Sequence, residues 1–231
     1  MNKNRALELV NVSFSYNENR EILSKVNATF NKGSMTGIVG LSGSGKTSLI
    51  RLMNASLLKE GQYDFQGSIK LMSKDIREEK NVNRLIGSVY QDPDNQIIFT
   101  KVLDEIVFGM ENKNKSHAYM ETKLGQVLKL LAIEDLKLQD PNQLSGGEKQ
   151  LLVLASILAL DVDILILDEC MTGVSLSSRQ KVLSIIKDLR DQGKCIIMIE
   201  HDFENLVDAD QIYELKKGAL TPIKLNDFKI E

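Results

Sequence analysis

Short stretches along the whole chain carry the hydrophobic pattern of β-strands. In residues 10–16 apolar and polar side chains alternate, as they do in a strand with one buried face. In residues 164–167 and 195–199 the apolar residues are continuous, which is typical of strands buried on both faces. Further strands are expected at residues 22–30, 35–39, 68–72, 86–90 and 211–215. Residues 17–19 and 61–67 are expected to form a turn and a loop.

Other stretches repeat their apolar residues at the period of an α-helix. The clearest stripe consists of Met120, Leu124, Val127, Leu128 and Leu131. Helices are expected at residues 48–58, 101–110, 118–131, 145–160 and 176–192. Because strands alternate with helices, the pattern predicts an α/β fold with parallel strand pairing. The mostly helical residues 93–155 interrupt this alternation. We therefore expect a single domain, residues 1–231, with a core of about 1–92 and 156–231 and an inserted helical subdomain at about 93–155.

The composition narrows the class of protein. Of 231 residues, 42% are hydrophobic and 26% are charged, as in ordinary globular proteins that build one sizeable core. Lys and Arg total 29 against 32 acidic residues, and the net charge of −3 argues against nucleic-acid binding, which usually shows a basic excess. The two cysteines, Cys170 and Cys195, suit a reducing compartment. Neither these cysteines nor the two histidines have the spacing of metal ligands.

The start of the chain does not resemble a secretory leader, because polar residues 1–5 are followed by strand-like alternation. The longest apolar-rich run, residues 151–160, is about half as long as the roughly 20 residues that a membrane-spanning helix needs. These features predict a cytosolic protein, or one that is attached to a membrane through a partner.

The first candidate site is the loop between the expected strand at 35–39 and the helix that follows it. Residues 40–47, Gly-Leu-Ser-Gly-Ser-Gly-Lys-Thr, satisfy the phosphate-loop pattern G-x-x-x-x-G-K-[ST]. Glycines allow the backbone to fold around an anion, and the N–H groups at a helix N-terminus attract phosphate. Lys46 adds a charge for the β- and γ-phosphates, and the Thr47 hydroxyl is a ligand for Mg²⁺. The alternative is a glycine-rich turn before a helix. We expect a nucleoside triphosphate to bind residues Gly40, Ser42, Gly43, Ser44, Gly45, Lys46, Thr47 and Ser48.

Two carboxylates, Asp168 and Glu169, follow the buried strand at residues 164–167. Ligand sites of open α/β sheets lie at the carboxyl ends of the strands, so both side chains can face the phosphate loop. Asp168 is placed to hold the metal, and Glu169 to accept a proton from an attacking water. The alternative is a pair of solvated acids at the end of a strand.

A third motif, Ser145-Gly146-Gly147-Glu148, precedes a nearly wholly apolar helix. Ser145 and Glu148 have the spacing of a capping box, which satisfies free N–H groups at a helix start without any ligand. Capping does not explain the paired glycines, Gly146 and Gly147, which lower helix propensity but permit close approach of another group.

The order and spacing of these three motifs resemble an ATP-binding cassette (ABC) ATPase, with its Walker A loop, signature sequence and Walker B strand. The resemblance covers about residues 10–220. It implies a P-loop NTPase (RecA-like) α/β fold with a mostly parallel sheet core, an N-terminal antiparallel β region and an inserted helical subdomain. It also implies a dimer in which each ATP lies between one subunit's phosphate loop and the other's signature helix. Ser145, Gly146 and Gly147 would then contact ATP in trans.

Three further positions match the family. Tyr16 occupies the place of the aromatic residue that stacks on adenine, or is one more apolar residue of the first strand. Gln91 matches the glutamine that approaches metal and water and links to the membrane partner, with a polar strand end as the alternative. His201 matches the histidine that senses the γ-phosphate, with a surface histidine as the alternative. The resemblance thus implies catalytic roles for Lys46, Gln91, Glu169 and His201, and Mg²⁺ ligation by Thr47, Gln91 and Asp168.

Residues 89–99 and 104–109 resemble energy-coupling factor transporter ATPases, which drive uptake of vitamins or transition-metal ions. The resemblance implies three partners: a second ABC ATPase subunit, an integral membrane coupling protein and a substrate-binding membrane protein. It places the chain at the cytoplasmic face of the membrane, held there by its partners. No nucleic acid is expected to bind. Another class of ABC importer or exporter remains an alternative.

The chain departs from the family pattern at several positions. Ser175 replaces an aspartate that helps to couple the two ATP sites, Leu151 stands where a basic residue is frequent, and Glu200 stands where Thr or Ser is frequent. Two hypotheses follow: a hydrolysing motor subunit, which the complete set of site residues favours, or a mainly regulatory nucleotide-binding partner in an asymmetric heterodimer.

Overall fold

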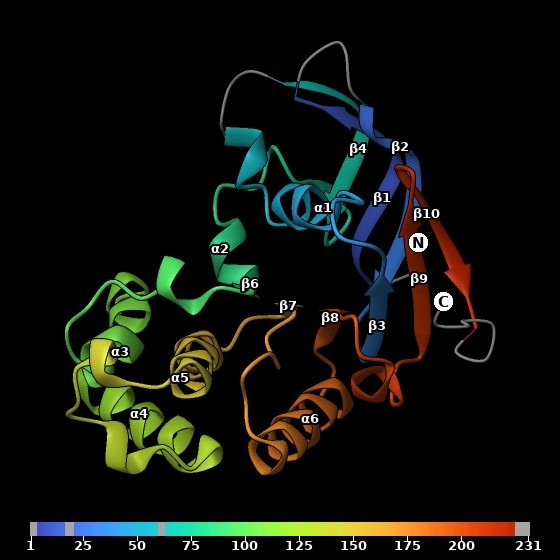
Figure 1. The fold of residues 1–231 in the computed structure, drawn as a ribbon. Coiled ribbons are helices and arrows are strands. Elements are labelled where there is room, and N and C mark those ends of the chain that lie inside the picture. The colour runs from blue at the N-terminus through green and yellow to red at the C-terminus, as the bar shows by residue number, and fades with distance from the viewer. Residues whose placement is uncertain (1–3, 17–20, 60–62, 225–231) are drawn as a thin grey trace. The chain divides into compact units, whose positions relative to one another are not determined.

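The computed structural model describes residues 4–16, 21–59 and 63–224, so the expected turn at 17–19 lies outside the described residues. The strands are β1 (Arg5–Ser15), β2 (Glu21–Asn31), β3 (Ser34–Val39), β4 (Asp64–Leu71), β5 (Lys74–Asp75), β6 (Ile86–Val89), β7 (Ile164–Asp168), β8 (Cys195–Ile199), β9 (Gln211–Lys216) and β10 (Ala219–Ile223) (Figure 1). The α-helices are α1 (Lys46–Met53), α2 (Val82–Leu85), α3 (Val102–Asn112), α4 (His117–Leu131), α5 (Gly146–Ala159) and α6 (Leu176–Asp191). Short 3₁₀ helices span Leu57–Lys59, Pro93–Asn95, Glu134–Leu136, Pro141–Gln143 and Phe203–Leu206.

The strands form two sheets. The first has the order β2-β1-β4-β5, and its neighbouring strands are antiparallel. The second has the order β10-β9-β3-β8-β7-β6, in which β3 pairs in parallel with both β8 and β9, while β10 is antiparallel to β9. Every residue of β7 and β8 is buried, as their continuous apolar runs predict. The predicted α/β fold with an N-terminal antiparallel region is confirmed.

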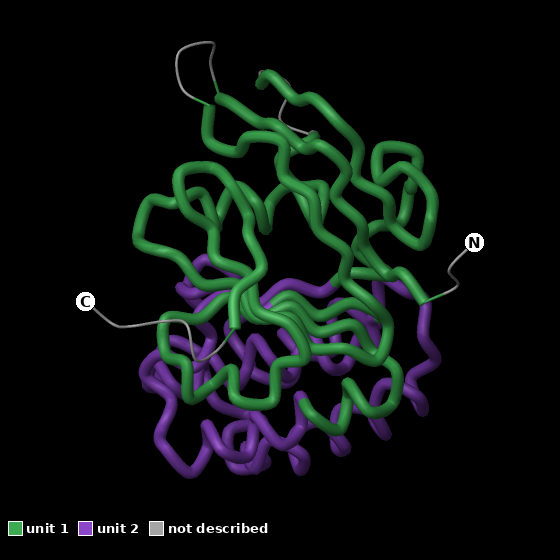
Figure 2. Tube along the Cα trace, turned by 90° about the vertical axis from the view of Figure 1, so that its right-hand side faces the viewer, with its two compact units in different colours: residues 1–86, 163–166, 187–231 green, residues 87–162, 167–186 purple. Residues whose placement is uncertain are grey.

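The chain divides into two compact units, which Figure 2 draws in green and purple. Unit 1 comprises residues 1–86, 163–166 and 187–231. In its antiparallel sheet, Leu7, Leu9, Val12 and Phe14 of β1 are each at most 1% exposed. The pairing of β1 with both neighbouring strands shifts register between Leu9 and Ser13, where Asn11 has a φ of 50°. This irregularity, together with alternation on either side of it, sets which side chains are buried.

Unit 2 comprises residues 87–162 and 167–186, and α3, α4 and α5 pack side by side within it (Figure 1). The stripe predicted along α4 is buried at Leu124, Val127, Leu128 and Leu131. The helices α3 and α5 approach closely at Gly109, where a Cβ would lie 2.6 Å from a methyl carbon of Leu160. In the same unit, Lys113 Nζ donates to the Leu160 carbonyl oxygen at 2.7 Å and so satisfies a carbonyl at the end of α5.

Two predictions from local pattern were wrong. The helix expected at 48–58 begins at Lys46 and ends at Met53, because Asn54 is its C-cap and Ala55 adopts a left-handed φ of 61°. The loop expected at 61–67 is a strand from Asp64 onward, because its backbone pairs with β1, for example Phe65 with Phe14. Pairing with a neighbouring strand overrides the polar composition of this stretch. The short elements β5, α2 and β10 were not predicted.

None of the helices in the described ranges is both long and apolar enough to cross a membrane.

Candidate nucleotide-binding site

The phosphate loop connects β3 to α1 within unit 1. Gly43 and Gly45 have φ values of 76° and 106°, a region of backbone conformation that other residues rarely adopt. Gly45 is also the N-cap of α1, and its carbonyl oxygen accepts from Leu49 N at 2.9 Å. At Gly40 a Cβ would lie 2.5 Å from the Leu215 carbonyl oxygen, so the loop has no room for a side chain there. The glycines of the motif are therefore required by the geometry of the loop itself.

Lys46 lies along the loop that precedes it. The residue is 8% exposed, and its Nζ donates to the carbonyl oxygens of Gly40 at 2.8 Å and Leu41 at 3.2 Å. The same Nζ lies 3.5 Å from Nε2 of His201, a residue on the segment that follows β8. Lys46 and His201, which the sequence separates by 155 positions, are thus brought together in unit 1.

Tyr16 lies at the end of β1, beside α1. Its hydroxyl is 3.1 Å from Oγ of Ser48, and its ring meets the Phe14 ring edge to face at 4.9 Å between centroids. Tyr16 is 45% exposed, whereas Phe14 is 1% exposed. This exposure leaves ring surface on which a base can stack, which an ordinary core residue of the strand would lack.

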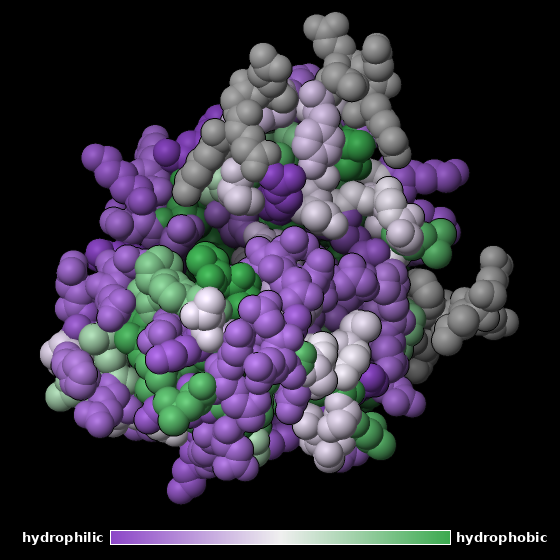
Figure 3. Space-filling view, turned by 60° about the vertical axis from the view of Figure 1, so that its left-hand side comes forward, coloured by the Kyte–Doolittle hydropathy of each residue, from purple (hydrophilic) through white to green (hydrophobic). Residues whose placement is uncertain are grey.

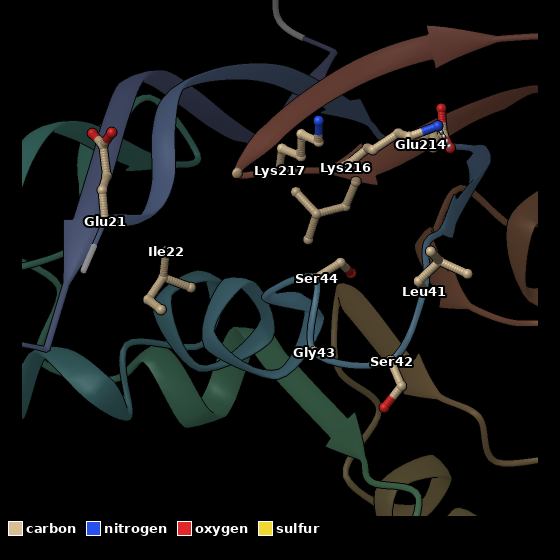
Figure 4. Close-up of a pocket in the computed structure, with 11 residues that line it drawn as sticks. Glu21, Ile22, Leu41, Ser42, Gly43, Ser44, Glu214, Lys216 and Lys217 are labelled. Atoms are coloured by element: carbon tan, nitrogen blue, oxygen red, sulfur yellow. Dashed lines mark ion pairs between the residues drawn. The ribbon is translucent and has the colours of Figure 1, made fainter.

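A cavity of about 350 Å³ borders residues 41–44 of the loop (Figure 4). Glu21 and Ile22 of β2 line one side, and the segment from Glu214 to Gly218, at the β9–β10 turn, lines another. Ser44 Oγ is buried and has no hydrogen-bond partner among the residues that the structure describes. The loop is therefore fixed at its two ends, by β3 and α1, and borders open space between them.

The two carboxylates lie at the end of β7, in the part of this strand that belongs to unit 2. Asp168 is 7% exposed, and Glu169 is half-buried. Glu169 has a φ of 48°, a left-handed conformation that costs a residue with a side chain about 1–3 kcal/mol. Its Oε2 accepts from Nε2 of Gln91 at 2.8 Å, although 78 positions separate the two residues. Glu169 thus combines a strained backbone with a carboxylate that contacts Gln91, just after β6.

The signature motif begins α5 with Ser145 as its N-cap. Ser145 donates to Glu148 Oε2 from its hydroxyl at 2.7 Å and from its backbone N at 2.8 Å, and its Oγ accepts from Glu148 N at 3.4 Å. The predicted capping box is confirmed. The two bonds from Ser145 hold the pKa of the Glu148 carboxyl below its usual value, so Glu148 is ionised at neutral pH.

The two glycines of this motif differ in their surroundings. A Cβ at Gly147 would lie 2.6 Å from the Gly173 carbonyl oxygen, so this glycine lets α5 approach the segment that follows Glu169. A Cβ at Gly146 would have no described atom within 4 Å. The fold of the described chain thus explains Gly147 and leaves Gly146 open to another molecule.

We expect Gly147→Ala to destabilise the protein by about 1–3 kcal/mol, because the new methyl group overlaps backbone that cannot move away freely. Gly146→Ala, the matched control, should leave the unfolding midpoint unchanged or slightly higher, because alanine favours helix and meets no neighbour here. Thermal unfolding of both variants is the measurement. Equal midpoints for the two would contradict the assignment.

The oxygen donors of this chain fit Mg²⁺. The candidate ligands are a threonine hydroxyl at Thr47, an amide at Gln91 and a carboxylate at Asp168, which are the hard oxygen ligands that Mg²⁺ prefers. Across residues 4–16, 21–59 and 63–224, no three His, Cys, Asp or Glu side chains gather closely enough to hold a metal by themselves.

The predicted site residues therefore fall into two groups. Unit 1 holds the phosphate loop with Tyr16, Ser48 and His201, while unit 2 holds Gln91 with both carboxylates and the signature motif. Sequence reasoning assigned no role to Gln96 or Gln150, which bind the backbone next to Gln91. No local signal singles out Gln150, because it follows the polar residues Glu148 and Lys149 at the start of α5.

A phosphate loop between a β-strand and an α-helix, in an α/β fold with a mixed sheet, defines a P-loop NTPase. The sequence pattern of the ABC transporter family matches residues 23–172, and the chain belongs to this family of ATPases as the ATPase subunit of a transporter.

The chain is related to energy-coupling factor transporter ATP-binding proteins. The chain is 35% identical over 217 residues to the energy-coupling factor transporter ATP-binding protein EcfA1 of Fusobacterium nucleatum, covering 93% of this chain and 80% of the relative. The structure of cbiO1 from Clostridium perfringens, part of the ABC transporter complex cbiONQ, has a TM-score of 0.83 and 25% identity, over 97% of this chain and 90% of that one. The dimeric cassette MJ0796, bound to ADP and Pi, shares the fold with a TM-score of 0.84 and 23% identity, over 96% of this chain and all of the other.

Proposed function

We propose that this chain is the ATP-hydrolysing motor subunit of an energy-coupling factor type importer, whose cargo is a vitamin or a transition-metal ion. The observation that carries the proposal is the contact between Gln91 Nε2 and Glu169 Oε2 at 2.8 Å, because it joins the two residues that would handle the attacking water. The identity with the EcfA1 protein of Fusobacterium nucleatum supports this branch of the family.

The proposed chemistry is distributed over named side chains. Lys46, now held by loop carbonyl oxygens, exchanges these acceptors for phosphate oxygens when ATP binds. Glu169 accepts a proton from the attacking water, Gln91 orients Glu169 and the water, and His201 contacts the γ-phosphate. Thr47, Asp168 and Gln91 are the residues that would hold Mg²⁺, which would neutralise phosphate charge.

The site is completed by a second ATPase subunit, arranged head to tail. In support, Ser145 and Gly146 are exposed at the start of α5, and no described atom would meet a Cβ at Gly146. The N-terminus of a helix with free N–H groups is a favourable partner for the γ-phosphate of an ATP held by the other subunit. We propose a RecA-like core of about residues 1–92 and 156–231 and a helical subdomain of about 93–155. The two compact units have other bounds, because unit 2 spans residues 87–162 and 167–186.

An exposed apolar surface of unit 2 supports a membrane partner. Ile98 is 74% exposed and Phe108 is 38% exposed, and the Phe108 ring lies 4.9 Å from the ring of Phe99. Buried Glu105 fixes this surface, because its Oε2 accepts from the backbone N of Ile98 at 2.8 Å and of Phe99 at 2.9 Å. Figure 3 shows hydrophobic side chains exposed among polar ones on the helical part of this unit. An integral membrane coupling protein would cover this surface and hold the chain at the cytoplasmic face of the membrane, together with a substrate-binding membrane protein.

A second candidate is a mainly regulatory nucleotide-binding partner in an asymmetric heterodimer. The observation that favours it is Ser175, which stands where the family has aspartate. Ser175 Oγ accepts from Ser178 N at 3.3 Å and donates to Ser178 Oγ at 3.0 Å, so it acts at the start of α6 as a cap. The Ser175 hydroxyl carries no charge, whereas the aspartate that it replaces is charged and helps to couple the two ATP sites in the family.

Affinity purification from membranes tests the proposal. A tagged chain is expected to bring down one further ABC ATPase or a second copy of itself, one coupling protein and one small membrane protein that binds a vitamin or metal ion. ATPase activity of the purified assembly and of the isolated chain is then compared. Robust turnover by the isolated chain favours the motor over the regulatory candidate. Recovery with no membrane protein would contradict the transport assignment.

A further inference from the structure

We infer that Gln150, on the signature helix α5, is a positioning residue that sets Gln91 against the catalytic carboxylate of the same chain. The inference deepens the proposed function and depends on it, because it takes Glu169 as the residue that accepts the proton. It adds a physical connection between the helix that faces the other subunit's ATP and the chemistry of this subunit's own site.

The connection begins with the side-chain amide of Gln150. Its Nε2 donates to the Gln91 carbonyl oxygen at 2.8 Å and to the Tyr90 carbonyl oxygen at 3.3 Å. Since both neighbours are acceptors, only the NH₂ end of the amide can face them. The side chain of Gln91 in turn donates to Glu169 Oε2 at 2.8 Å. One buried amide therefore fixes the backbone from which the Gln91 side chain reaches Glu169.

The burial of Gln150 indicates that the NH₂ end of its amide explains why a glutamine occupies this position. Gln150 is 3% exposed, and its Oε1 is buried without a hydrogen-bond partner in the described ranges of the chain. An unpaired buried acceptor destabilises a fold, so an apolar side chain of similar size would suit packing at this position better. A glutamine at this position is explained by the two bonds that its nitrogen donates.

Two other contacts hold the same stretch of chain. Gln96 Oε1 accepts from Tyr90 N at 2.6 Å, and Gln96 Nε2 donates to the Ser88 carbonyl oxygen at 2.9 Å. Next to Gln150 on α5, Lys149 Nζ forms an ion pair with Asp94 at 2.6 Å. The segment after β6 is thus fixed on one side by its own Gln96 and on the other by α5.

A consequence follows for how the signature helix acts. Ser145 and Gly146 begin α5, and Gln150 lies little more than one helical turn further along, so a displacement of the helix start moves the amide that holds Gln91. Docking of another subunit's ATP on the helix start would reach Glu169 of this chain through hydrogen bonds within unit 2. The helix would then both bind nucleotide in trans and set the catalytic geometry in cis.

The test replaces Gln150 by methionine, which has similar size and no donor. In the purified full-length chain within its membrane complex, Gln150→Met is expected to lower kcat for ATP hydrolysis about tenfold and to leave the Kd for ATP within about twofold. The matched control is Gln126→Met, the same change at an exposed position of α4, with kcat unchanged. Gln150→Asn, which withdraws the amide by one methylene, gives the same comparison if the methionine variant fails to fold.

A purely structural role is separated by a double-mutant cycle with Gln91→Ala. If Gln150 acts through Gln91, adding Gln150→Met to Gln91→Ala causes little further loss of kcat. An additive loss of kcat in the double variant, or a folded Gln150 variant with the kcat of the unmodified chain, overturns the inference.

Glu169→Gln, measured in the same complex, distinguishes failure of this inference from failure of the proposed function. If it retains turnover, the proposed function fails and the inference with it, whereas a dead Glu169→Gln beside an unaffected Gln150→Met rejects the inference alone.

Discussion

Glu169→Gln is expected to retain ATP binding and to lower turnover of the assembled complex by about two to three orders of magnitude. In the proposed mechanism this carboxylate accepts the proton of the attacking water, and the amide that replaces it cannot act as a base. The substitution keeps the size of the side chain, and an amide oxygen can still accept from Gln91 Nε2, which donates at 2.8 Å in the native chain. The effect should therefore fall on kcat rather than on binding or folding.

The measurement is steady-state phosphate release together with equilibrium binding of a fluorescent ATP analogue. Glu121→Gln makes the same change at an exposed position of α4 and should leave both quantities unchanged. Turnover by the Glu169 variant at the level of the unmodified complex would show that another group accepts the proton. Loss of ATP binding would instead assign Glu169 to the binding of the nucleotide.

Lys46→Met is expected to weaken ATP binding by about tenfold to hundredfold, and turnover at subsaturating ATP should fall at least as much. Lys46 is nearly buried, and its Nζ already points at two carbonyl oxygens of the phosphate loop. A hydrogen bond to a charged group contributes about 1.5–3 kcal/mol, which corresponds to this range of affinity. Methionine retains the apolar length of the side chain and removes its charge.

Titration with the same fluorescent analogue measures this loss, and Lys129→Met, at an exposed position of α4, is the matched control. The unfolding midpoint of Lys46→Met without nucleotide should be compared as well, since the native Nζ satisfies two loop carbonyl oxygens. A variant that binds ATP as tightly as the unmodified chain would exclude Lys46 from the phosphate site.

Local sequence determined the parts of this protein whose conformation depends on covalent geometry and on the burial of one segment. The phosphate loop was predictable because Gly43 and Gly45 adopt backbone angles that few other residues tolerate. The strand at residues 195–199 was predictable because its apolar run has no polar face to expose. The capping box was predictable because its two partners are three residues apart.

Tertiary structure decided every contact between segments that are distant in the chain. Residues 64–67 became strand through pairing with β1, although their composition is that of a loop. Gln91 meets Glu169 across 78 positions and Gln150 across 59, and the spacing of residues along the chain carries no information on such pairs. The two signature glycines look equivalent in the sequence, yet only Gly147 faces the backbone of Gly173. The motifs thus indicated which chemistry this chain performs, whereas long-range hydrogen bonding and packing determined which side chains can act together.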